Sequence, residues 1–472
     1  MTNNLRVYNT LTRQKEPFVT IEPGKVRMYV CGATPYASSH IGHAMSWIVF
    51  DVIRRYLEHI GYDVRHATNF TDIDDKIIAR ANREEIDPAE LTAGLIAEWH
   101  RENQALGIKP ATLYPRATRE IPAIVETIEG LIQKGYAYPV DGDVYYRVRA
   151  FEDYGKLSHR DLDDLLSGAR IEVDERKEDP LDFALWKAAK PGEPSWPSPW
   201  SAGRPGWHIE CSAMVSNHLD GVIDIHGGGA DLIFPHHENE IAQSEAYLGH
   251  KPFARYWVHN GLLQLGTDKM SKSIGNIVPA KELVERGLGR PFRLMVLQSH
   301  YRAPLTYTED ALDAAARGLD RLLAAAKPGA AAWTEVNTLP GGDLAALVEE
   351  TGRRFDSAMD DDFDTPVAVA ALFDLARSIN RAKADGGDPG TTEAAQSRLI
   401  ALAGVLGLDL VGQQDHDLGD VAPIIDLLID VRNRLRDAKQ WALADQIRDG
   451  LCERGIAIED TPAGTTWRRA AR

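Results

Sequence analysis

The chain has 472 residues, of which 26% are charged and 44% hydrophobic, and it carries a formal net charge of −17 at pH 7. This length exceeds one hydrophobic core, and at about 150 residues per domain it predicts three or four domains. The acidic excess excludes a protein that coats nucleic acid without selectivity, because such binding depends on neutralising phosphates. Selective recognition through local basic clusters stays possible.

The three cysteines, Cys31, Cys211 and Cys452, are too few and too widely spread for a disulfide framework. Metal or substrate chemistry is the better interpretation. The first fifteen residues lack the apolar stretch of a secretory signal, and no run approaches the roughly 18 apolar residues of a membrane span. We therefore expect a cytoplasmic protein without a membrane partner.

The first predicted unit is a β-α-β segment. Residues 26–30 form a β-prone run, residues 45–53 carry an apolar pattern with helical spacing, and residues 62–68 form a second β-prone run. This order is typical of a parallel sheet. It predicts the nucleotide-binding half of an α/β domain.

An inserted module is predicted next. A helical apolar face over residues 121–132 ends at Gly135, and Asp141-Gly142 lies between β-like runs as a hairpin turn. The proline-rich stretch 190–206 predicts an ordered loop without regular structure, whose tryptophans pack over a pocket.

Strand-like runs return at residues 222–225 and 256–259, so the module is predicted to interrupt one α/β domain. From residue 311 onward the pattern is mostly helical. A last unit is predicted over residues 421–472, after a linker rich in turn residues.

The first chemical motif is His40-Ile41-Gly42-His43, in the loop after the first strand and at the start of its helix. Imidazoles and helix N-terminal amides there can hold polyphosphate, and Gly42 lets the backbone approach a flat base closely. A His-x-Gly-His run has little specificity by itself.

The second motif is Lys269-Met270-Ser271-Lys272-Ser273, in a loop after the late strand of the sheet. Two lysines on a mobile loop can neutralise the charge that develops on pyrophosphate as it leaves. Two lysines in a loop are often only solvent-exposed side chains without a function. The two motifs in this order, however, indicate ATP chemistry far more specifically than either motif does by itself.

Soft metal ligands form a third group, made of Cys31, Cys211, His236 and Glu240. His236 and Glu240 are four residues apart on a segment that Pro235 could start as a helix, so both side chains can face one point. Zn²⁺ accepts Cys, His and Glu ligands, and thiolates select it over harder metals. The plain alternatives are a buried Cys acting as a small hydrophobe and a His-rich turn acting as a cap.

Weaker features allow two explanations each. The run His226-Gly227-Gly228-Gly229 with Asp231 could admit adenosine or form a tight turn. The acids at residues 72, 74 and 75 predict a helix cap. Cys452 fits a structural position on a helix. Basic clusters near the end of the chain are solvated faces or contacts to a nucleic-acid backbone: Arg432, Arg434, Arg436, Lys439, Arg468, Arg469 and Arg472.

Together these motifs resemble those of the cysteinyl-tRNA synthetase family, one of the class I aminoacyl-tRNA synthetases, from Val26 to Arg469. The resemblance rests on Cys31-Gly32 before the first motif, on residues 205–212 (PGWHIECS), on the glycine run through Glu240, on residues 269–273, and on Ala444-Asp445 with Trp467-Arg468-Arg469. No motif position departs from the family pattern.

The resemblance implies an α/β fold with a Rossmann-type parallel-sheet catalytic domain, a connective insertion, a helical bundle and a small C-terminal anticodon-binding domain. The boundaries expected from it are 1–114 for the first catalytic half, 115–203 for the insertion, 204–265 for the second half with the zinc site, 266–325 for the lysine loop and stem-contact segment, 326–412 for the bundle, and 413–472 for the anticodon-binding domain.

The resemblance also implies roles for individual residues. One Zn²⁺ per chain is expected on Cys31, Cys211, His236 and Glu240. Catalytic roles fall to His40, His43, Lys269 and Lys272; ATP contacts to His40, Gly42, His43, Gly228 and Lys272; cysteine contacts to Gly32, Thr71, Trp207 and Asp231; and anticodon contacts to Arg436, Trp441, Asp445 and Asp460.

The activity implied is ATP-dependent activation of L-cysteine and its transfer to the terminal adenosine of tRNA-Cys by a monomer, with Mg²⁺ accompanying ATP. Two alternatives remain. One is a cysteine ligase of thiol (mycothiol-type) biosynthesis, which joins cysteine to an amino sugar. The other is a non-catalytic tRNA-binding zinc protein. The insertion is too short for a large hydrolytic editing domain, so we expect discrimination against serine by metal chemistry.

Overall fold

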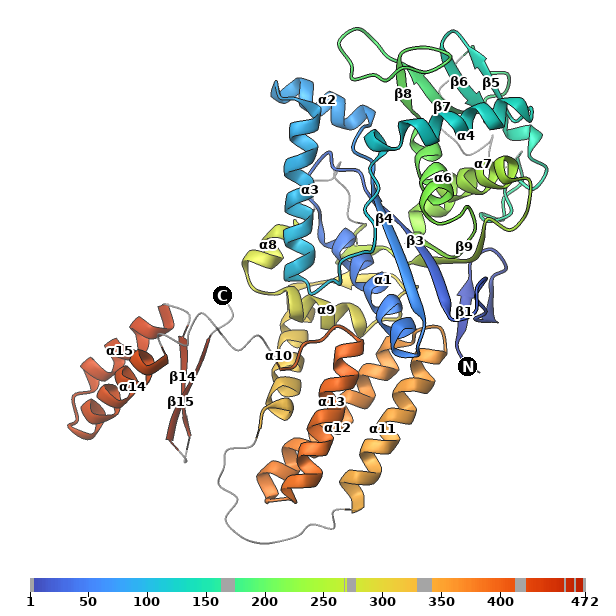
Figure 1. The fold of residues 1–472 in the computed structure, drawn as a ribbon. Helices are drawn as coiled ribbons and strands as arrows, with labels where there is room; N and C mark the ends of the chain where they lie inside the picture. Colours follow the sequence, from blue (N-terminus) through green and yellow to red (C-terminus); the bar gives the residue numbers. More distant parts are fainter. Residues whose placement is uncertain are drawn as a thin grey trace.

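The fold is built on a four-stranded parallel sheet with the strand order β10-β9-β3-β4 in this computed structural model (Figure 1). The structure describes residues 4–162, 175–266, 268–269, 277–328, 342–411, 422–453, 456–461 and 464–469. The strands of this sheet are β3 (Lys25–Ala33), β4 (Asp63–Phe70), β9 (Ile223–Gly229) and β10 (Ala254–Asn260). Each strand extends past the carboxyl end of its predicted range. In β9 and β10 the added residues pair with each other, so the glycine run belongs to the sheet.

Helix α1 (Ile41–His59) connects β3 to β4 and packs its apolar residues against the sheet, which confirms the predicted β-α-β order. His40 is the N-cap of this helix, and its ring accepts a hydrogen bond from the backbone N–H of His43. Helix α1 therefore starts at the end of β3, where ligands bind in open parallel sheets.

The predicted inserted module lies between β4 and β9 in the chain and forms its own antiparallel sheet, β5-β6-β7-β8. The predicted hairpin turn is confirmed, since Asp141 and Gly142 have φ values of 52° and 89°. The stretch 190–206 was expected to lack regular structure, which is wrong at its end. Residues 203–205 form β8, and all three pair with β7 in antiparallel register.

The elements of the module and of the flanking segments have the following bounds: β1 (Arg6–Asn9), β2 (Gln14–Pro17), α2 (Asp75–Glu84), α3 (Pro88–Ala105), α4 (Ile121–Gln133), β5 (Ala137–Val140), β6 (Asp143–Tyr146), β7 (Phe183–Ala188), β8 (Gly203–Pro205), α6 (Trp207–His218) and α7 (Glu238–Leu248). Asp74 caps α2, as predicted for this acidic run. Asp72 instead accepts hydrogen bonds from Thr118, and Asp75 pairs with Lys187.

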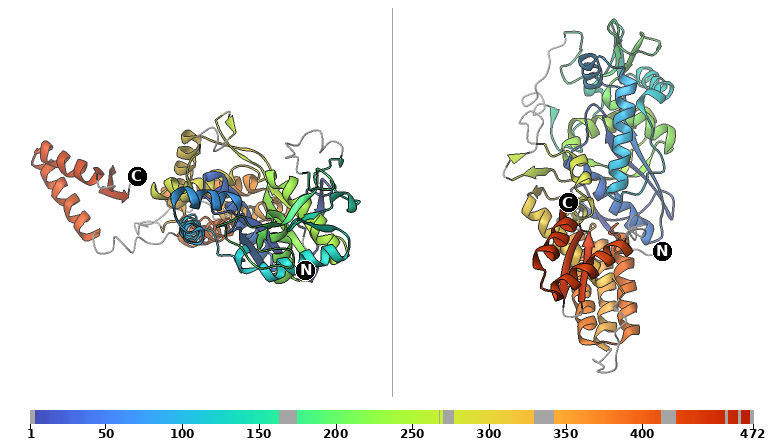
Figure 2. Two further views of the ribbon diagram at one scale, coloured as in Figure 1. Left: turned by 90° about the horizontal axis from the view of Figure 1, so that it is seen from above. Right: turned by 90° about the vertical axis from the view of Figure 1, so that its left-hand side faces the viewer.

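The rest of the chain is mainly helical, as predicted, and extends away from the sheet (Figure 2). Its elements are β11 (Leu263–Leu265), β12 (Asp268–Lys269), α8 (Ala280–Glu285), α9 (Gly289–Leu297), β13 (Leu305–Tyr307), α10 (Glu309–Ala326), α11 (Gly342–Asp360), α12 (Thr365–Asp385), α13 (Pro389–Val405), α14 (Ala422–Asp437), α15 (Trp441–Glu453), β14 (Ile456–Thr461) and β15 (Gly464–Arg469).

Two large apolar cores follow from this layout. One joins α1 and one face of the sheet to helices α9–α13, and the other fills the space between the sheet, α4, α6, α7 and the inserted module. The two cores hold opposite walls of the cleft above the strand ends. Within the described residues, no helix is long and apolar enough to cross a membrane.

Candidate active site and metal centre

A cavity of about 390 Å³ opens at the carboxyl ends of the parallel strands. This is the edge at which ligands bind in open α/β sheets. Its walls come from β3, the start of α1, the end of β4, the start of α6 and the turn after β9. Most of the residues predicted to contact ATP, cysteine or metal line it: Cys31, Gly32, His40, Gly42, His43, Thr71, Trp207, Cys211, Asp231 and His236.

Four predicted metal ligands meet at the base of this cavity. The Cys31 and Cys211 sulfurs are 3.9 Å apart, Cys211 Sγ lies 3.6 Å from His236 Nε2, and Glu240 Oε1 lies 2.9 Å from His236 Nε2 and 3.4 Å from Cys31 Sγ. All four ligand atoms lie within 4.8 Å of one another. Donors at bond lengths of about 2.0–2.3 Å around one tetrahedral ion have such mutual spacings, so the set fits a metal ion.

The local backbone of this cluster differs from the prediction. Pro235 does not start a helix: the Phe234–Pro235 peptide bond is cis, residues 233–237 form an irregular turn, and α7 begins at Glu238. His236 therefore lies before the helix and Glu240 within its first turn. The two side chains still face one point because the turn leads directly into the helix.

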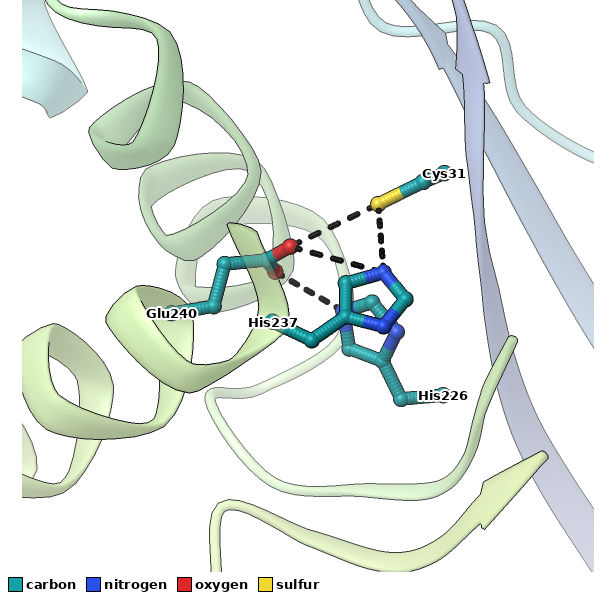
Figure 3. Close-up of side chains that lie close together, drawn as sticks. All are labelled: Cys31, His226, His237 and Glu240. Atoms are coloured by element: carbon teal, nitrogen blue, oxygen red, sulfur yellow. Dashed lines mark hydrogen bonds and ion pairs between the residues drawn. The ribbon is translucent and has the colours of Figure 1, made fainter. Parts of the chain in front are cut away.

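A second constellation shares two of these ligands (Figure 3). His226 Nε2 lies 2.8 Å from Glu240 Oε2, and His237 Nε2 lies 3.3 Å from Cys31 Sγ. His237 Nδ1 in turn lies 2.8 Å from His259 Nε2. The ligand atoms of Cys31, His226, His237 and Glu240 also lie within 4.8 Å of one another, so these four residues are a second group that could hold a metal ion. If the ion lies on the first group, His226 bonds to the outer oxygen of Glu240, and such a bond fixes the orientation of a ligand.

The four side chains of the cluster shift one another's pKa values. The hydrogen bond from Cys31, together with His236, lowers the pKa of Cys211 to about 6 against the opposing effect of burial. Burial raises the pKa of Cys31. For His236, burial opposes protonation, but the Glu240 carboxylate raises its pKa to about 10. The pair of thiols thus holds one thiolate near neutral pH, which is the form that binds metals.

The histidine motif lies at the opposite wall. The His40 and His43 rings stack with centroids 3.7 Å apart at the start of α1, and both line the cavity. Lys76 at the start of α2 is the single Lys or Arg among the described residues of the lining. Lys269 lies in β12, but its side chain and all of Lys272 lie outside the described residues.

The predicted substrate contacts are close together, with one exception. Trp207 stacks on His236 with ring centroids 4.4 Å apart. Gly32 is required by close packing, because a Cβ there would lie 1.7 Å from the Asn69 carbonyl oxygen. Gly228 does not line the cavity; a Cβ on it would meet His237 at 2.8 Å. Its predicted ATP contact stays a prediction.

The predicted anticodon contacts lie in the C-terminal unit. Trp441 begins α15 and is 56% exposed, and Asp445 on the same helix pairs with Arg448 at 3.3 Å. Arg436 lies near the end of α14. Asp460 is in β14, with its side chain outside the described residues. Cys452 lies on α15, which confirms the predicted helix, but it is exposed, so its assignment as a small buried hydrophobe is wrong.

Sequence reasoning missed several residues of the site: Asn69, Lys76, Glu210, His237 and the role of His226. His237 follows the predicted ligand His236, and Glu210 precedes Cys211 within the motif at residues 205–212. Adjacency to a predicted ligand could therefore have identified both as candidate site residues. Which of two adjacent histidines faces the metal depends on the turn after β9, and no periodicity reveals that turn.

Comparisons with known proteins agree with this geometry. Residues 17–317 match the family of tRNA synthetases class I (C) catalytic domain, residues 354–411 match the DALR domain, and residues 418–468 match the cysteinyl-tRNA ligase anticodon binding domain. The sheet and the cleft at its strand ends are therefore those of a class I tRNA synthetase.

Relatives give the particular family. The cysteine–tRNA ligase of Dehalococcoides mccartyi is 54% identical over 98% of this chain and 99% of its own, and that of Heliobacterium modesticaldum is 50% identical over 99% and 100%. This chain belongs to the cysteine–tRNA ligase family.

Solved structures with low identity share the fold. The Mycobacterium tuberculosis methionyl-tRNA synthetase in complex with methionyl-adenylate superposes with a TM-score of 0.58 at 17% identity, covering 81% of this chain and 89% of its own. The LeuRS of Agrobacterium radiobacter gives 0.58 at 11% identity, covering 85% and 88%.

Proposed function

We propose that this chain activates L-cysteine with ATP and transfers it to the terminal adenosine of tRNA-Cys. The observation that carries the proposal is the convergence of Cys31, Cys211, His236 and Glu240 at the base of the cavity. Family membership supports the class of reaction, and the two sulfurs at the base of the cavity support cysteine as the amino acid. We further propose that the protein acts as a monomer in the cytoplasm and that its domains have the boundaries predicted from the sequence.

The donor set favours Zn²⁺ over harder divalent ions, because two sulfurs and an imidazole suit a soft metal. When bound, the ion supplies a Lewis-acidic partner for the substrate thiolate. Cys211, His236 and Glu240 are buried, and Cys31, Cys211, His236 and Trp207 line the cavity. His226 and His237 hold Glu240 and Cys31 in place through the hydrogen bonds described above.

The reaction has two steps. An oxygen of the cysteine carboxylate bonds to the α-phosphorus of ATP while the bond to the β-phosphate oxygen breaks, and pyrophosphate leaves. The oxygen of a ribose hydroxyl of the terminal adenosine then bonds to the carbonyl carbon of the adenylate while the bond from that carbon to the phosphate oxygen breaks. AMP leaves, and the proton of the hydroxyl is released. Positioning and charge stabilisation supply most of the acceleration in such transfers, so no protein nucleophile is needed.

The phosphate chemistry belongs to residues at the other wall of the cavity. His40 and His43 lie at the N-terminus of α1, whose amides and rings suit the phosphates of ATP. Lys269 and Lys272 are proposed to neutralise departing pyrophosphate, and Mg²⁺ accompanies ATP. Gly42 lets the nucleotide approach the helix closely.

Serine differs from cysteine by one atom, and a pocket that selects by shape rejects such analogues by only about a hundredfold. Bonding of sulfur to the metal separates the two by chemistry. The amino-sugar ligase is the less favoured alternative, because the anticodon-domain match covers residues 418–468. The non-catalytic alternative is disfavoured by the match of a catalytic domain over residues 17–317.

Two assays on the full-length chain test the proposal. The first is cysteine-dependent exchange of pyrophosphate into ATP, and the second is aminoacylation of tRNA-Cys with cysteine or serine, each before and after zinc chelation. We expect activity with cysteine and not with serine. Chelation of zinc should abolish this activity, and added Zn²⁺ should restore it. Charging of an amino sugar in place of tRNA would support the first alternative, and no cysteine-dependent exchange at all would support the second.

A further inference from the structure

One basic side chain lines the cavity apart from the metal cluster and the histidine motif. Lys76, in the first turn of α2, is exposed and is the single Lys or Arg among the described residues of the lining. The short connection from β4 to α2 begins at Thr71 and ends just before Lys76, and both residues line the cavity. A cation therefore lies on the same wall as a residue of the proposed cysteine subsite.

The acidic residues beside Lys76 are engaged elsewhere. Asp72 accepts hydrogen bonds from the start of the inserted module, and the Asp74 side chain caps α2. Asp75 pairs with Lys187 at 2.8 Å. Within the part of the chain that the structure describes, Lys76 belongs to no ion pair, so its charge is available to an anionic ligand.

The Tyr36 ring holds the Lys76 ammonium at the cavity. Lys76 Nζ lies 5.1 Å from the centroid of this ring, which is within the range of a cation–π interaction. Tyr36 is half-buried in the loop between β3 and α1 and lines the cavity as well. Its carbonyl oxygen accepts a hydrogen bond of 2.9 Å from Arg80 on α2. These contacts fix the loop and α2 to each other, so the cation is in place before a ligand arrives.

Two anions are candidates for this cation: the phosphates of ATP and the phosphate backbone of the tRNA acceptor end. The loop with Lys269 and Lys272, proposed for pyrophosphate, follows β10 in the chain, whereas Lys76 follows β4. These strands are the opposite edges of the parallel sheet. With a net charge of −17 the protein as a whole repels a nucleic-acid strand, so the entry of its end requires a local cation.

We propose that Lys76 binds the phosphate on the 5′ side of the terminal adenosine of tRNA-Cys, with Tyr36 as the positioning residue that holds its ammonium. This inference rests on the proposed function and adds the residue that places the acceptor end for transfer. The phosphate is joined to the ribose whose hydroxyl reacts, so fixing it restricts where that hydroxyl can lie. A phosphate contact positions the strand without reading its sequence.

The first test compares Lys76→Gln with Arg83→Gln in the full-length chain. Arg83 is the matched control, because it lies on the same helix and is exposed but does not line the cavity. We expect Lys76→Gln to lower kcat/KM for tRNA-Cys about tenfold, the effect of one hydrogen bond to a charged group. Pyrophosphate exchange without tRNA should stay within about twofold. Lys76→Arg, which keeps the charge, should retain most of the transfer activity.

The second test identifies the phosphate with a tRNA-Cys that lacks its terminal adenosine and the 5′-phosphate of that nucleotide. Lys76→Gln should weaken binding of the complete tRNA about tenfold and leave binding of the shortened tRNA unchanged. For the complete tRNA, the plot of log affinity against log salt concentration should become less steep by about 0.7, the contribution of one phosphate contact on a single strand. A merely structural role of Lys76 would not change this slope.

The role of Tyr36 is tested through its ring. Tyr36→Phe keeps the aromatic face and should retain most of the transfer activity, whereas Tyr36→Leu should lose part of it. If Tyr36 acts through Lys76, adding Tyr36→Leu to Lys76→Gln should lower kcat/KM for tRNA no further. An equal loss in both backgrounds would contradict this positioning role.

Three results would overturn the assignment of Lys76. A raised KM for ATP in exchange by Lys76→Gln would place the residue on ATP, and equal weakening of both tRNAs would place it on another phosphate. Equal charging by Lys76→Gln and Arg83→Gln would show that Lys76 has no role in transfer. If the unchanged protein charges no tRNA-Cys, the proposed function fails instead, so the two failures are distinguishable.

Discussion

At the scale of single residues, the two thiols of the metal cluster are not equivalent to the third cysteine. Cys31 and Cys211 lie 3.9 Å apart with a histidine and a glutamate, whereas Cys452 is exposed on α15. Cys31 and Cys211 belong to a group of side chains that could hold a metal ion, and the neighbours of Cys211 stabilise its thiolate. Their substitution should therefore affect metal and substrate together.

We expect Cys211→Ser to remove bound zinc and to abolish cysteine activation while the fold survives, because a hydroxyl is a poor ligand for a soft metal. Metal analysis, pyrophosphate exchange and far-ultraviolet circular dichroism measure the three effects. Cys452→Ser is the matched control and should resemble the unchanged protein. Exchange at the original rate by a metal-free Cys211→Ser chain would contradict the assignment.

His226 should matter without touching the ion. Its Nε2 holds Glu240 Oε2 at 2.8 Å, so His226→Ala frees the carboxylate and should lower zinc affinity by about 10–100-fold. Competition with a chromophoric chelator measures this affinity. His250→Ala, at an exposed position, provides the control. Equal affinities in the two variants would show that Glu240 needs no support from His226.

At the scale of elements, the site depends on how closely β3 approaches the end of β4. The pairing of these strands shifts register between Val30 and Ala33, and Gly32 lies within this irregularity. A side chain at this position would collide with the Asn69 backbone, so the strand ends can meet at the cavity only with glycine there.

Gly32→Ala should lower the free energy of unfolding by about 1–3 kcal/mol, because backbone must move to admit the methyl group. The same change at Gly94, on the exposed face of α3 with no atom near its Cβ, should instead stabilise by about 0.5–1 kcal/mol. Denaturant unfolding of both variants measures the contrast. Opposite signs are required, and destabilisation of equal size in both would contradict the close-approach argument.

At the scale of the whole molecule, a buried ion pair joins the catalytic core to the helical region. Arg293 on α9 contacts Asp51 of α1 at 2.7 Å and donates to the carbonyl oxygens of Leu106 and Leu406, which follow α3 and α13. Both charged side chains are at most 1% exposed. Four helices thus share one cation, which fixes their ends relative to each other.

Asp51→Asn should destabilise by about 3–5 kcal/mol, because it leaves the guanidinium buried without its counter-charge. Burial opposes ionisation, but Arg293 and Arg55 hold the pKa of Asp51 below its ordinary value. This stabilisation is therefore present above the ordinary carboxyl pKa and is lost as the pH falls through the lowered one. Unfolding measured from about pH 6 to pH 3 should show a shallower loss of stability in the variant. Glu350→Gln, in an exposed pair with Arg353, should change stability by less than about 1 kcal/mol.

The C-terminal unit should separate the two steps of the reaction. Trp441→Ala removes an exposed aromatic surface on which a base can stack, so kcat/KM for tRNA should fall about tenfold or more while pyrophosphate exchange stays unchanged. Val367→Ala, also exposed and apolar but on α12, is the control. A parallel loss in both assays would place the effect of Trp441 on folding rather than on tRNA.

The sequence by itself determined the main elements of secondary structure and the residue types of the metal cluster. Local patterns predicted the β-α-β start, the hairpin at Asp141-Gly142 and the helical second half, because periodicity and turn preferences are properties of neighbouring residues. Residue type, the spacing of His236 and Glu240, and the resemblance to a known family together predicted which four side chains meet at the cluster, since the chemistry of a soft metal limits the choice of ligands.

Only the tertiary structure decided how these groups are held. The pairing of His226 with Glu240 and the bond between Glu210 and Thr71 each join residues from different elements. Such contacts depend on strand order and on the packing of α6 and α7 over the sheet, which no short sequence window encodes. Short sequence motifs identify the ligand residues, but the orientation of their side chains results from the folding of the whole domain.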